Sequence, residues 1–329
     1  ASGRSRLSSR RTDSARIVVF PRGRQRKLHA AMRIWYSDPY RLPLPPGHRF
    51  PAEKYRLVRE RLLAEGIIRE DELTLAPLIP WEDLERVHTP NYLQALRFGT
   101  LPEPAQRRIG FPWSPELVIR SRASVGGTCR ALEMALRDGI SGNLAGGTHH
   151  AFADGGAGFC VFNDLAVAAS LALAAGWVRR LAVLDLDVHQ GDGTAAILRG
   201  RKGLFLVSVH AQRNYPFHKV PSDLDVGLPD GAGDEDYLEV LRVVLREVER
   251  FRPELVLYQA GVDVLRADRL GRLALSMDGL AARDRLVLGW ARRRKVPVVL
   301  TLGGGYARPI ALTVEAHVQT YRIARELFG

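Results

Sequence analysis

Short apolar runs recur in the second half of the chain, and they predict buried β-strands. The runs are rich in β-branched residues and do not alternate between apolar and polar positions. A continuous apolar pattern is typical of a strand that is covered on both faces, as in a parallel sheet. The four runs are Leu181–Val188, Leu204–Val209, Leu255–Tyr258 and Val296–Leu302.

Segments with the period of an α-helix lie between or after these runs. They are Tyr237–Val248, Met277–Trp290 and Ile310–Leu327. Acidic residues near the helix starts and arginines near the ends agree with the helix dipole. The alternation of strands and helices predicts an α/β fold with a central, mainly parallel sheet flanked by helices. We expect one domain over residues 32–329, because the candidate site residues named below are far apart in sequence and have to converge.

The positive charge of the chain is concentrated at its start. The formal net charge is +12, and residues 1–33 carry ten Lys and Arg against one Asp. The rest of the sequence is near neutral, so nucleic-acid binding is expected only through this basic segment, if at all. We interpret residues 1–31 as a disordered basic arm or a non-native extension, with a transit-type peptide as the alternative.

Cysteine usage and hydropathy bear on the compartment. Cys129 and Cys160 are the two cysteines of the chain, which excludes a disulfide framework and suits a reducing environment. The longest uncharged apolar run, Leu165–Val178, is shorter than the roughly 20 residues that a membrane span needs. We therefore expect no membrane span and a cytoplasmic location, while the oligomeric state stays open.

Candidate metal ligands follow the strand runs. In Asp185-Leu186-Asp187-Val188-His189, alternate residues of an extended chain face one side, which brings two carboxylates and an imidazole together. Two acids at a buried strand end are costly unless a cation or a histidine compensates them. Nitrogen and oxygen ligands are compatible with a catalytic zinc ion held by three side chains. We interpret Asp187 and His189 as two ligands and Asp263 as the third, although an Asp after a strand is more often a cap or turn residue.

Two further clusters supply groups that amide hydrolysis needs. A base has to take a proton from water and an acid has to protonate the leaving amine, and His149 and His150 suit both roles near neutral pH. Gly303-Gly304-Gly305 permits close backbone approach and leads to Tyr306, whose hydroxyl can donate to a developing oxyanion. Taken alone, each cluster is equally compatible with a glycine-rich loop or turn.

Together these segments resemble the histone deacetylase family of the arginase/deacetylase superfamily. The matching motifs follow the family's order and span about Tyr36 to Leu327. They are Gly146-Gly147-Thr148-His149-His150, Gly156-Ala157-Gly158-Phe159-Cys160, Asp185-Leu186-Asp187-Val188-His189-Gln190-Gly191-Asp192-Gly193, Ala260-Gly261-Val262-Asp263 and Gly303-Gly304-Gly305-Tyr306. The resemblance implies an arginase/deacetylase-like domain that hydrolyses the N-acyl amide of acyl-lysine with one zinc ion. Gln190 and the loop Gly261–Gly271 resemble the class IV branch and its bacterial relatives.

The resemblance also implies a role for each matching residue. Asp187, His189 and Asp263 would bind zinc, and Tyr306 would polarise the scissile carbonyl. Asp185 would orient His149, and Asp192 would orient His150.

A substrate channel and a second cation are implied in the same way. Phe159, next to Gly158, would form one wall of a narrow acyl-lysine channel, and Phe217 is the candidate for the opposite wall. Family members hold a potassium ion beside the zinc site. The matching groups are the side chains of Asp185 and Ser208 and the backbone carbonyls of Asp187, His189 and Val209.

The substrate is open between several classes. Leu270 stands where polyamine-specific relatives carry an acidic residue, which favours acyl-lysine in a protein or peptide over a small N-acyl amine such as an acetylpolyamine. A two-manganese ureohydrolase is less favoured, because the matching positions hold ligands for one transition metal. A catalytically silent acyl-lysine binding module is a further alternative, although the complete set of site residues argues against it.

Overall fold

A single parallel sheet forms the centre of the molecule. The computed structural model describes residues 32–329, so the predicted basic arm, residues 1–31, lies outside the described residues. Within the described part, eight strands pair in the order β2-β1-β3-β8-β7-β4-β5-β6, and every neighbouring pair is parallel. The strands are β1 Ile34–Tyr36, β2 Leu73–Leu75, β3 Ile140–Asn143, β4 Leu181–Asp185, β5 Leu204–Ala211, β6 Leu224–Leu228, β7 Leu255–Gln259 and β8 Val298–Thr301. The predicted fold class is confirmed.

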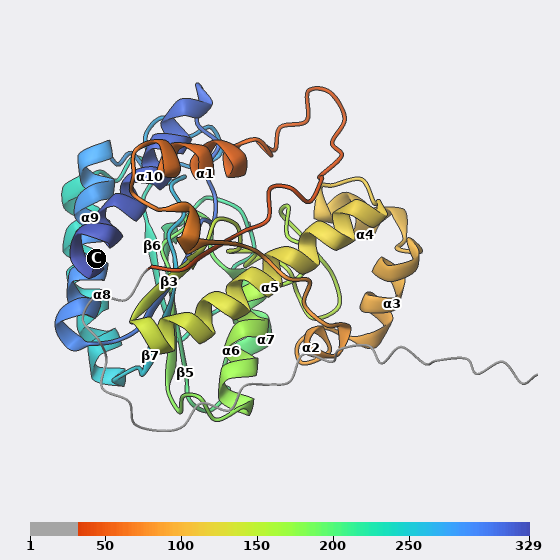
Figure 1. Cartoon of the computed structure of the whole chain (residues 1–329), viewed down its shortest axis with the longest axis horizontal. Coiled ribbons are helices and arrows are strands. Elements are labelled where there is room, and N and C mark those ends of the chain that lie inside the picture. Colours follow the sequence, from red (N-terminus) through yellow and green to blue (C-terminus); the bar gives the residue numbers. More distant parts are fainter. Residues whose placement is uncertain (1–31) are drawn as a thin grey trace, which may run out of the picture.

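Helices cover both faces of the sheet (Figure 1). Helices α1, α8, α9 and α10 pack on one face, and α5, α6 and α7 pack on the other, with α2, α3 and α4 beyond α5. Their bounds are α1 Lys54–Ala64, α2 Trp81–Leu84, α3 Pro90–Phe98, α4 Glu103–Ile109, α5 Pro115–Asp138, α6 Asp164–Ala174, α7 Asp192–Leu198, α8 Asp234–Phe251, α9 Met277–Arg294 and α10 Ile310–Phe328. A short 3₁₀ helix, Glu70–Glu72, precedes β2. None of the helices in the described part is long and apolar enough to cross a membrane.

The continuous apolar strands divide their side chains between two cores. In β4, Ala182 and Leu184 belong to the core under α8 to α10, whereas Leu181 and Val183 belong to the core under α5 and α6. Burial on both faces explains why the sequence shows no alternation along this strand.

Strand β4, which leads to the predicted metal ligands, is shorter than the apolar run Leu181–Val188 that predicted it. Strand β4 ends at Asp185, so the prediction of a strand through Val188 is wrong at its end. Two backbone N–H groups donate to side chains here instead of to a neighbouring strand: the Asp187 N–H donates to Asp185 Oδ1 at 3.1 Å, and the Val188 N–H donates to Asp263 Oδ1 at 2.9 Å. The Val188 carbonyl still accepts from the Ala211 N–H of β5 at 3.0 Å. Asp187 and His189 therefore lie in the loop between β4 and α7.

Candidate active site

Polar loops meet at the carboxyl edge of the sheet. The ends of β3, β4, β7 and β8 are level, since Asp185 pairs with Gln259, Gln259 with Thr301, and Thr301 with Asn143. The loops that follow these strands line a pocket of about 590 Å³, together with residues from α4 and from the loop after β5. The sheet therefore brings together candidate residues that are more than 150 positions apart in sequence, such as His149 and Tyr306.

Asp187, His189 and Asp263 form a buried candidate metal centre. One ligand atom from each lies within 4.8 Å of the other two. His189 Nδ1 is 3.1 Å from both Asp187 Oδ1 and Asp263 Oδ2, close to the spacing of about 3.3 Å between ligand atoms that tetrahedral zinc imposes. Burial and the charge of Asp187 raise the pKa of Asp263 to about 7. A divalent cation would offset this repulsion, so the three residues fit zinc.

Backbone groups fix both carboxylates in place. The Gly304 N–H donates to Asp187 Oδ2 at 2.7 Å, while Asp263 Oδ1 accepts from the backbone of Val188. This leaves Asp187 Oδ1 and Asp263 Oδ2 facing the His189 ring. The approach is so close that a Cβ atom on Gly304 would lie 1.8 Å from Asp263 Oδ2, and one on Gly261 would lie 2.4 Å from Asp187 Oδ2. Glycine at these two positions is a requirement of the site geometry.

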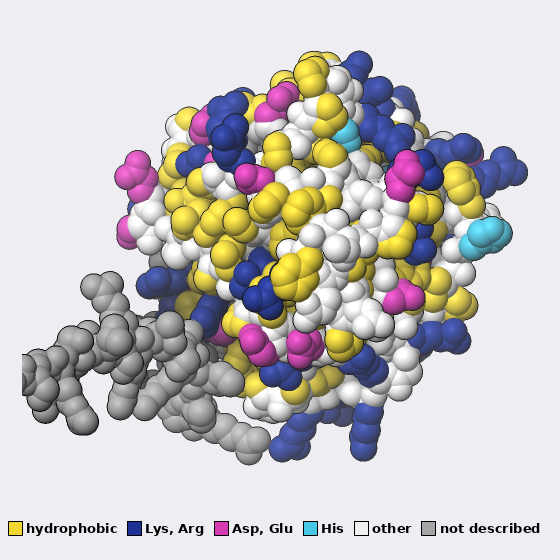
Figure 2. Space-filling model, turned by 90° about the vertical axis from the view of Figure 1, so that its right-hand side faces the viewer, with side chains coloured by type: hydrophobic (Ala, Val, Ile, Leu, Met, Phe, Trp, Pro, Cys, Tyr) yellow, Lys and Arg dark blue, Asp and Glu magenta, His cyan; other side chains and the backbone are white. Residues whose placement is uncertain are grey.

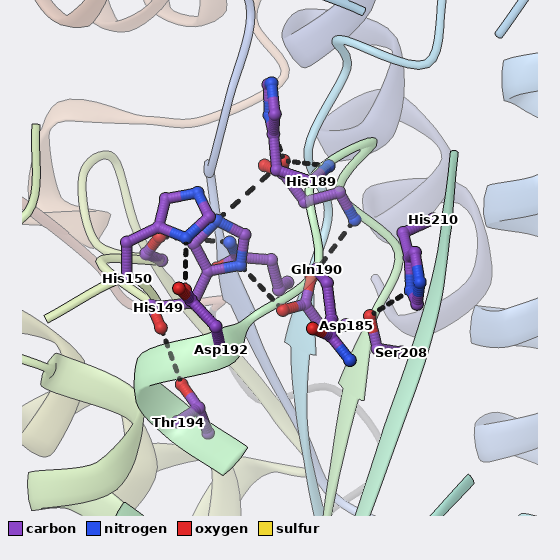
Figure 3. Close-up of polar contacts among 12 residues, drawn as sticks. His149, His150, Asp185, His189, Gln190, Asp192, Thr194, Ser208 and His210 are labelled. Carbon is purple, nitrogen blue, oxygen red and sulfur yellow. Dashed lines mark hydrogen bonds and ion pairs between the residues drawn. The ribbon is translucent and has the colours of Figure 1, made fainter. Parts of the chain in front are cut away.

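The two adjacent histidines each have a carboxylate partner (Figure 3). His149 Nδ1 lies 2.7 Å from Asp185 Oδ2, and His150 Nδ1 lies 2.6 Å from Asp192 Oδ1. Their ring centroids are 4.0 Å apart, and both rings are buried against the pocket. Because Nδ1 is engaged on each ring, Nε2 is the nitrogen left for chemistry. The structure thus contains both hydrogen bonds that the resemblance implies.

Opposite effects act on the pKa values of the two rings. Burial alone would lower the pKa of His149, but the carboxylates of Asp185 and Asp187 raise it to about 9. Burial and the adjacent charge of His149 lower the pKa of His150 to about 4. The rings are therefore electrostatically different despite their identical chemistry.

Asp164, which no sequence motif singled out, holds the segment before the histidines. Its carboxylate accepts hydrogen bonds from the backbone N–H groups of Gly147 at 3.0 Å and Thr148 at 2.7 Å. Asn163, the N-cap of α6, donates to the Ala151 carbonyl at 2.9 Å. The start of α6 thus anchors the histidine loop on both sides.

Two other residues outside the predicted site hold the glycine-rich loop before Tyr306. The Tyr306 N–H donates to Asp268 Oδ2 at 2.6 Å, and Lys54 Nζ donates to the Gly303 carbonyl at 3.0 Å. Lys54 Nζ also lies 5.2 Å from the centroid of the Tyr306 ring. Burial lowers the pKa of Lys54 to about 8, and burial raises the pKa of Tyr306 above its usual range. The phenol therefore keeps the proton that it would donate.

Aromatic side chains line the pocket. Phe159 packs against Phe50 and Phe111 at centroid distances of 5.2 and 5.3 Å and faces Tyr306 at 6.3 Å. The preceding Gly158 is needed, because a Cβ atom there would lie 2.7 Å from the His150 ring.

The loop after β5 contributes two aromatic residues to the pocket, Tyr215 and the predicted Phe217. The Tyr215 ring lies 4.9 Å from the His150 ring, whereas Phe217 is 79% exposed. Tyr215 thus occupies the deeper position, and the exposed Phe217 also lines the pocket. The sequence did not single out Tyr215 as a wall residue, because both aromatic residues lie within one irregular loop, and Phe217 as the opposite wall stays a prediction.

Three of the predicted potassium ligands, Asp185, Ser208 and Val209, lie on neighbouring strands, and the other two, Asp187 and His189, lie in the loop after β4. Asp185 of β4 is in register with Ser208 of β5, and Val209 follows on the same strand. Ser208 Oγ also forms a hydrogen bond of 2.9 Å with His210 Nδ1 (Figure 3), so its hydroxyl has a protein partner. The potassium site stays a prediction.

The side chain of Gln190 forms hydrogen bonds with the segment around β6. Its side-chain amide donates to the Val220 carbonyl at 2.9 Å and to Asp225 Oδ1 at 2.8 Å. Its carbonyl accepts from the Val220 N–H at 3.0 Å. The residue after the candidate ligand His189 therefore holds the loop before β6.

Comparison with known proteins identifies the family. The family model of the histone deacetylase domain matches residues 48–321. An uncharacterised protein of Picosynechococcus sp. is 44% identical over 296 residues, covering 90% of this chain and 99% of that protein. Histone deacetylase 2 of Arabidopsis thaliana is 32% identical over 300 residues, covering 86% of this chain and 77% of the relative. The crystal structure of an HDAC homolog complexed with SAHA has a TM-score of 0.78 and 25% identity, covering 91% of this chain and 84% of that chain.

The fold and the site define an α/β domain of the deacetylase type, in which a pocket at the carboxyl edge of a parallel sheet ends on a buried Asp-His-Asp group. The chain belongs to the histone deacetylase family. The resemblance seen in the sequence motifs is thereby confirmed, and the protein is a member of a hydrolase family.

Proposed function

We propose that the protein is a zinc-dependent lysine deacylase, which hydrolyses the amide of acyl-lysine to a free amine and a carboxylate. One observation carries the proposal: the same pocket is lined by two candidate metal ligands, Asp187 and His189, by the histidine pair and by Tyr306. Asp263 completes the ligand set beneath them. A binding module would need the apolar pocket but not this set of proton-transfer groups.

The groups of the chain divide the reaction between them. The chemistry that zinc supplies when bound to Asp187, His189 and Asp263 is Lewis-acid polarisation of the amide carbonyl. The Nε2 atoms of His149 and His150 take a proton from the attacking water and deliver one to the departing amine. The Tyr306 hydroxyl donates to the carbonyl oxygen as negative charge develops on it. Collapse of the tetrahedral species breaks the C–N bond.

Contacts around the reacting groups support these roles. Asp185 and Asp192 hold the two imidazoles by Nδ1, which fixes the ring orientation and leaves Nε2 toward the pocket. The aromatic walls made by Phe159 and Tyr215 suit the methylene chain of a lysine side chain. Leu270 at the outer part of the pocket, with no carboxylate of its own, favours acyl-lysine over a cationic acetylpolyamine.

Two finer assignments belong to the same proposal. Asp185 and Ser208, with the backbone carbonyls of Asp187, His189 and Val209, would hold potassium beside the zinc site. Gln190 and the loop Gly261–Gly271 support membership of the class IV branch. Both assignments rest on residues of this chain that match motifs of the histone deacetylase family.

Hydrolysis of an acyl-lysine peptide panel tests the proposal. The zinc-loaded protein is assayed with chains from acetyl to myristoyl, with and without a hydroxamate chelator, beside free acetylpolyamines. Turnover of the peptides that the hydroxamate abolishes is expected. Turnover of acetylpolyamines alone would favour a small N-acyl amine as substrate, and binding of acyl-lysine without turnover would favour a silent module.

A further inference from the structure

Arginine side chains surround the mouth of the pocket. Six of them line it, and they come from the loop before α1, from α4, from the loop after β5 and from the loop after β7. They are Arg49, Arg107, Arg108, Arg213, Arg269 and Arg272. All six are exposed. Four segments that are distant in sequence thus contribute like charges to one opening.

Most of this charge has no partner within the protein. Arg107 pairs with Glu103 and Arg272 pairs with Asp230. Among residues 32–329, no carboxylate lies within ion-pair distance of the other four arginines. The charge of these four guanidinium groups is therefore not neutralised by a carboxylate of the described residues and can attract an anionic ligand.

Overall composition does not account for the arrangement. Residues 32–329 carry 39 Lys and Arg against 35 Asp and Glu, so an average patch of this size would hold acids and bases in similar number. Asp187, the carboxylate that lines the described pocket, lies at its buried end and belongs to the candidate metal centre. The outer part therefore carries one sign of charge.

Apolar surface accompanies the arginines. Phe217 is 79% exposed and lines the pocket, and the Arg49 guanidinium lies 5.4 Å from the centroid of the Phe159 ring. Figure 2 views the side of the molecule that carries α3 and α4, where basic, acidic and hydrophobic side chains are interspersed. Arg107 and Arg108 belong to α4. A peptide chain laid over such a surface can contact charge and apolar groups together.

We infer that the substrate of this protein is an acyl-lysine set in an acidic peptide segment, with Asp or Glu residues on either side of it. The inference rests on the proposed deacylase function and specifies its substrate class. Four unpaired positive charges around one opening attract carboxylates and repel peptides rich in Lys and Arg, as well as cationic polyamines. Charges at the rim act on encounter and ground-state binding, so selectivity is expected in KM more than in kcat.

Three matched peptides test the inference. Each carries one acyl-lysine, flanked by Asp and Glu, by Gly and Ser, or by Lys and Arg. We expect kcat/KM for the acidic peptide to exceed that for the basic peptide by at least about tenfold at low salt. The difference should shrink when the salt rises from about 0.1 M to about 1 M, because the screening length falls from about 10 Å to about 3 Å.

Two double variants that remove the same charge at different places test whether the preference for the acidic peptide comes from the mouth of the pocket. In Arg213→Gln/Arg269→Gln the acidic-over-basic ratio should fall about twofold or more, since two exposed ion pairs with the acidic peptide are lost. Arg246→Gln/Arg293→Gln removes the same charge near the carboxyl ends of α8 and α9, which lead into β7 and β8 at the opposite edge of the sheet. This control should keep the ratio of the unaltered protein.

Peptide binding is measured by fluorescence anisotropy alongside turnover. Tighter, salt-sensitive binding of the acidic peptide that depends on Arg213 and Arg269 supports the inference even if no peptide is hydrolysed, in which case the proposed function fails by itself. Equal handling of the three peptides, or preference for the basic one, overturns the inference, while hydrolysis of the neutral peptide still upholds the proposed function. An equal effect of both double variants also overturns it, because the preference would then come from net charge.

Discussion

His150 Nδ1 lies 2.6 Å from Asp192 Oδ1, and both residues are buried. Asp192 is the first residue of α7, and His150 lies in the loop that α6 anchors. The hydrogen bond fixes the imidazole in the tautomer that leaves Nε2 available toward the pocket. The proposed proton transfer thus depends on a carboxylate that is not itself among the residues lining the pocket.

Removing the charge of Asp192 should slow turnover without releasing zinc. In Asp192→Asn we expect kcat to fall about 10- to 100-fold, the usual cost of losing the carboxylate that orients a functional histidine. Steady-state kinetics and metal analysis of the same sample give both quantities. Unchanged kcat would show that the carboxylate does not orient His150 for catalysis.

Loss of one candidate ligand should abolish zinc binding. Asp263→Asn removes the negative charge of a fully buried carboxylate that faces His189 Nδ1 at 3.1 Å. We expect zinc content, measured after dialysis by inductively coupled plasma mass spectrometry, to fall from about one per chain to near zero. Asp154→Asn, an exposed position without an ion pair in the described residues, is the control. Full zinc retention in Asp263→Asn would remove this residue from the ligand set.

Substitution of Gly304 should weaken zinc binding as substitution of a candidate ligand does. A Cβ atom in Gly304→Ala would lie 1.8 Å from Asp263 Oδ2, so the loop has to move away from the carboxylate. We expect weakened zinc binding and loss of most activity. Gly155→Ala is the matched control, because no atom lies within 4 Å of its Cβ position. Equal zinc affinity in the two variants would contradict the close packing described for this loop.

Acid should destabilise the protein through His88. Its Nδ1 donates to the Phe152 carbonyl at 2.9 Å, and its Nε2 accepts from the Asn163 N–H at 3.0 Å, so the neutral ring uses both nitrogens. Burial lowers the pKa of His88 from 6.5 to about 4. The folded state therefore disfavours the proton that the unfolded state accepts. The stability contributed by the neutral ring is complete above pH 6.5 and is lost as pH falls from 6.5 toward 4, by up to about 3 kcal/mol.

Urea unfolding between pH 8 and pH 4 measures this effect. The His88→Gln variant should be less stable at pH 8, because one buried hydrogen bond is lost at a cost of about 1–3 kcal/mol. Its stability should nevertheless fall less steeply over the acidic range. Parallel pH profiles for both proteins would assign the acid sensitivity to other groups.

The sequence predicted the parts of the site that are local in the chain. Asp185, Asp187 and His189 lie within five residues at the end of a buried apolar run, and this local pattern is enough to indicate a metal site. The supporting residues gave no such signal, because their partners are remote: Lys54 is 249 positions from Gly303, and Asp268 is 38 positions from Tyr306. Nothing in their local sequence distinguishes them from an ordinary helix start or loop acid.

The elements of the fold also divide into those that the local sequence pattern predicts and those that depend on remote partners. Continuously apolar buried strands such as β7 and amphipathic helices such as α8 were visible as patterns, whereas β1 and β2 have three residues each and are too short to show one. Strand β6 is an edge strand with alternating burial, so it lacks the continuous apolar run of the central strands. Such strands are defined by their pairing partners, which a single sequence does not contain.

In the proposed reaction this pocket hydrolyses acyl-lysine, and Tyr306 stabilises the oxyanion. The most direct test compares the unaltered protein with Tyr306→Phe at equal zinc content, following release of free lysine peptide and carboxylate by mass spectrometry. We predict equimolar products from the unaltered protein and a turnover lower by about 10²–10³-fold in the variant, the usual cost of losing an oxyanion donor. Equal turnover by the two proteins, or none by the zinc-loaded unaltered protein, would contradict the account.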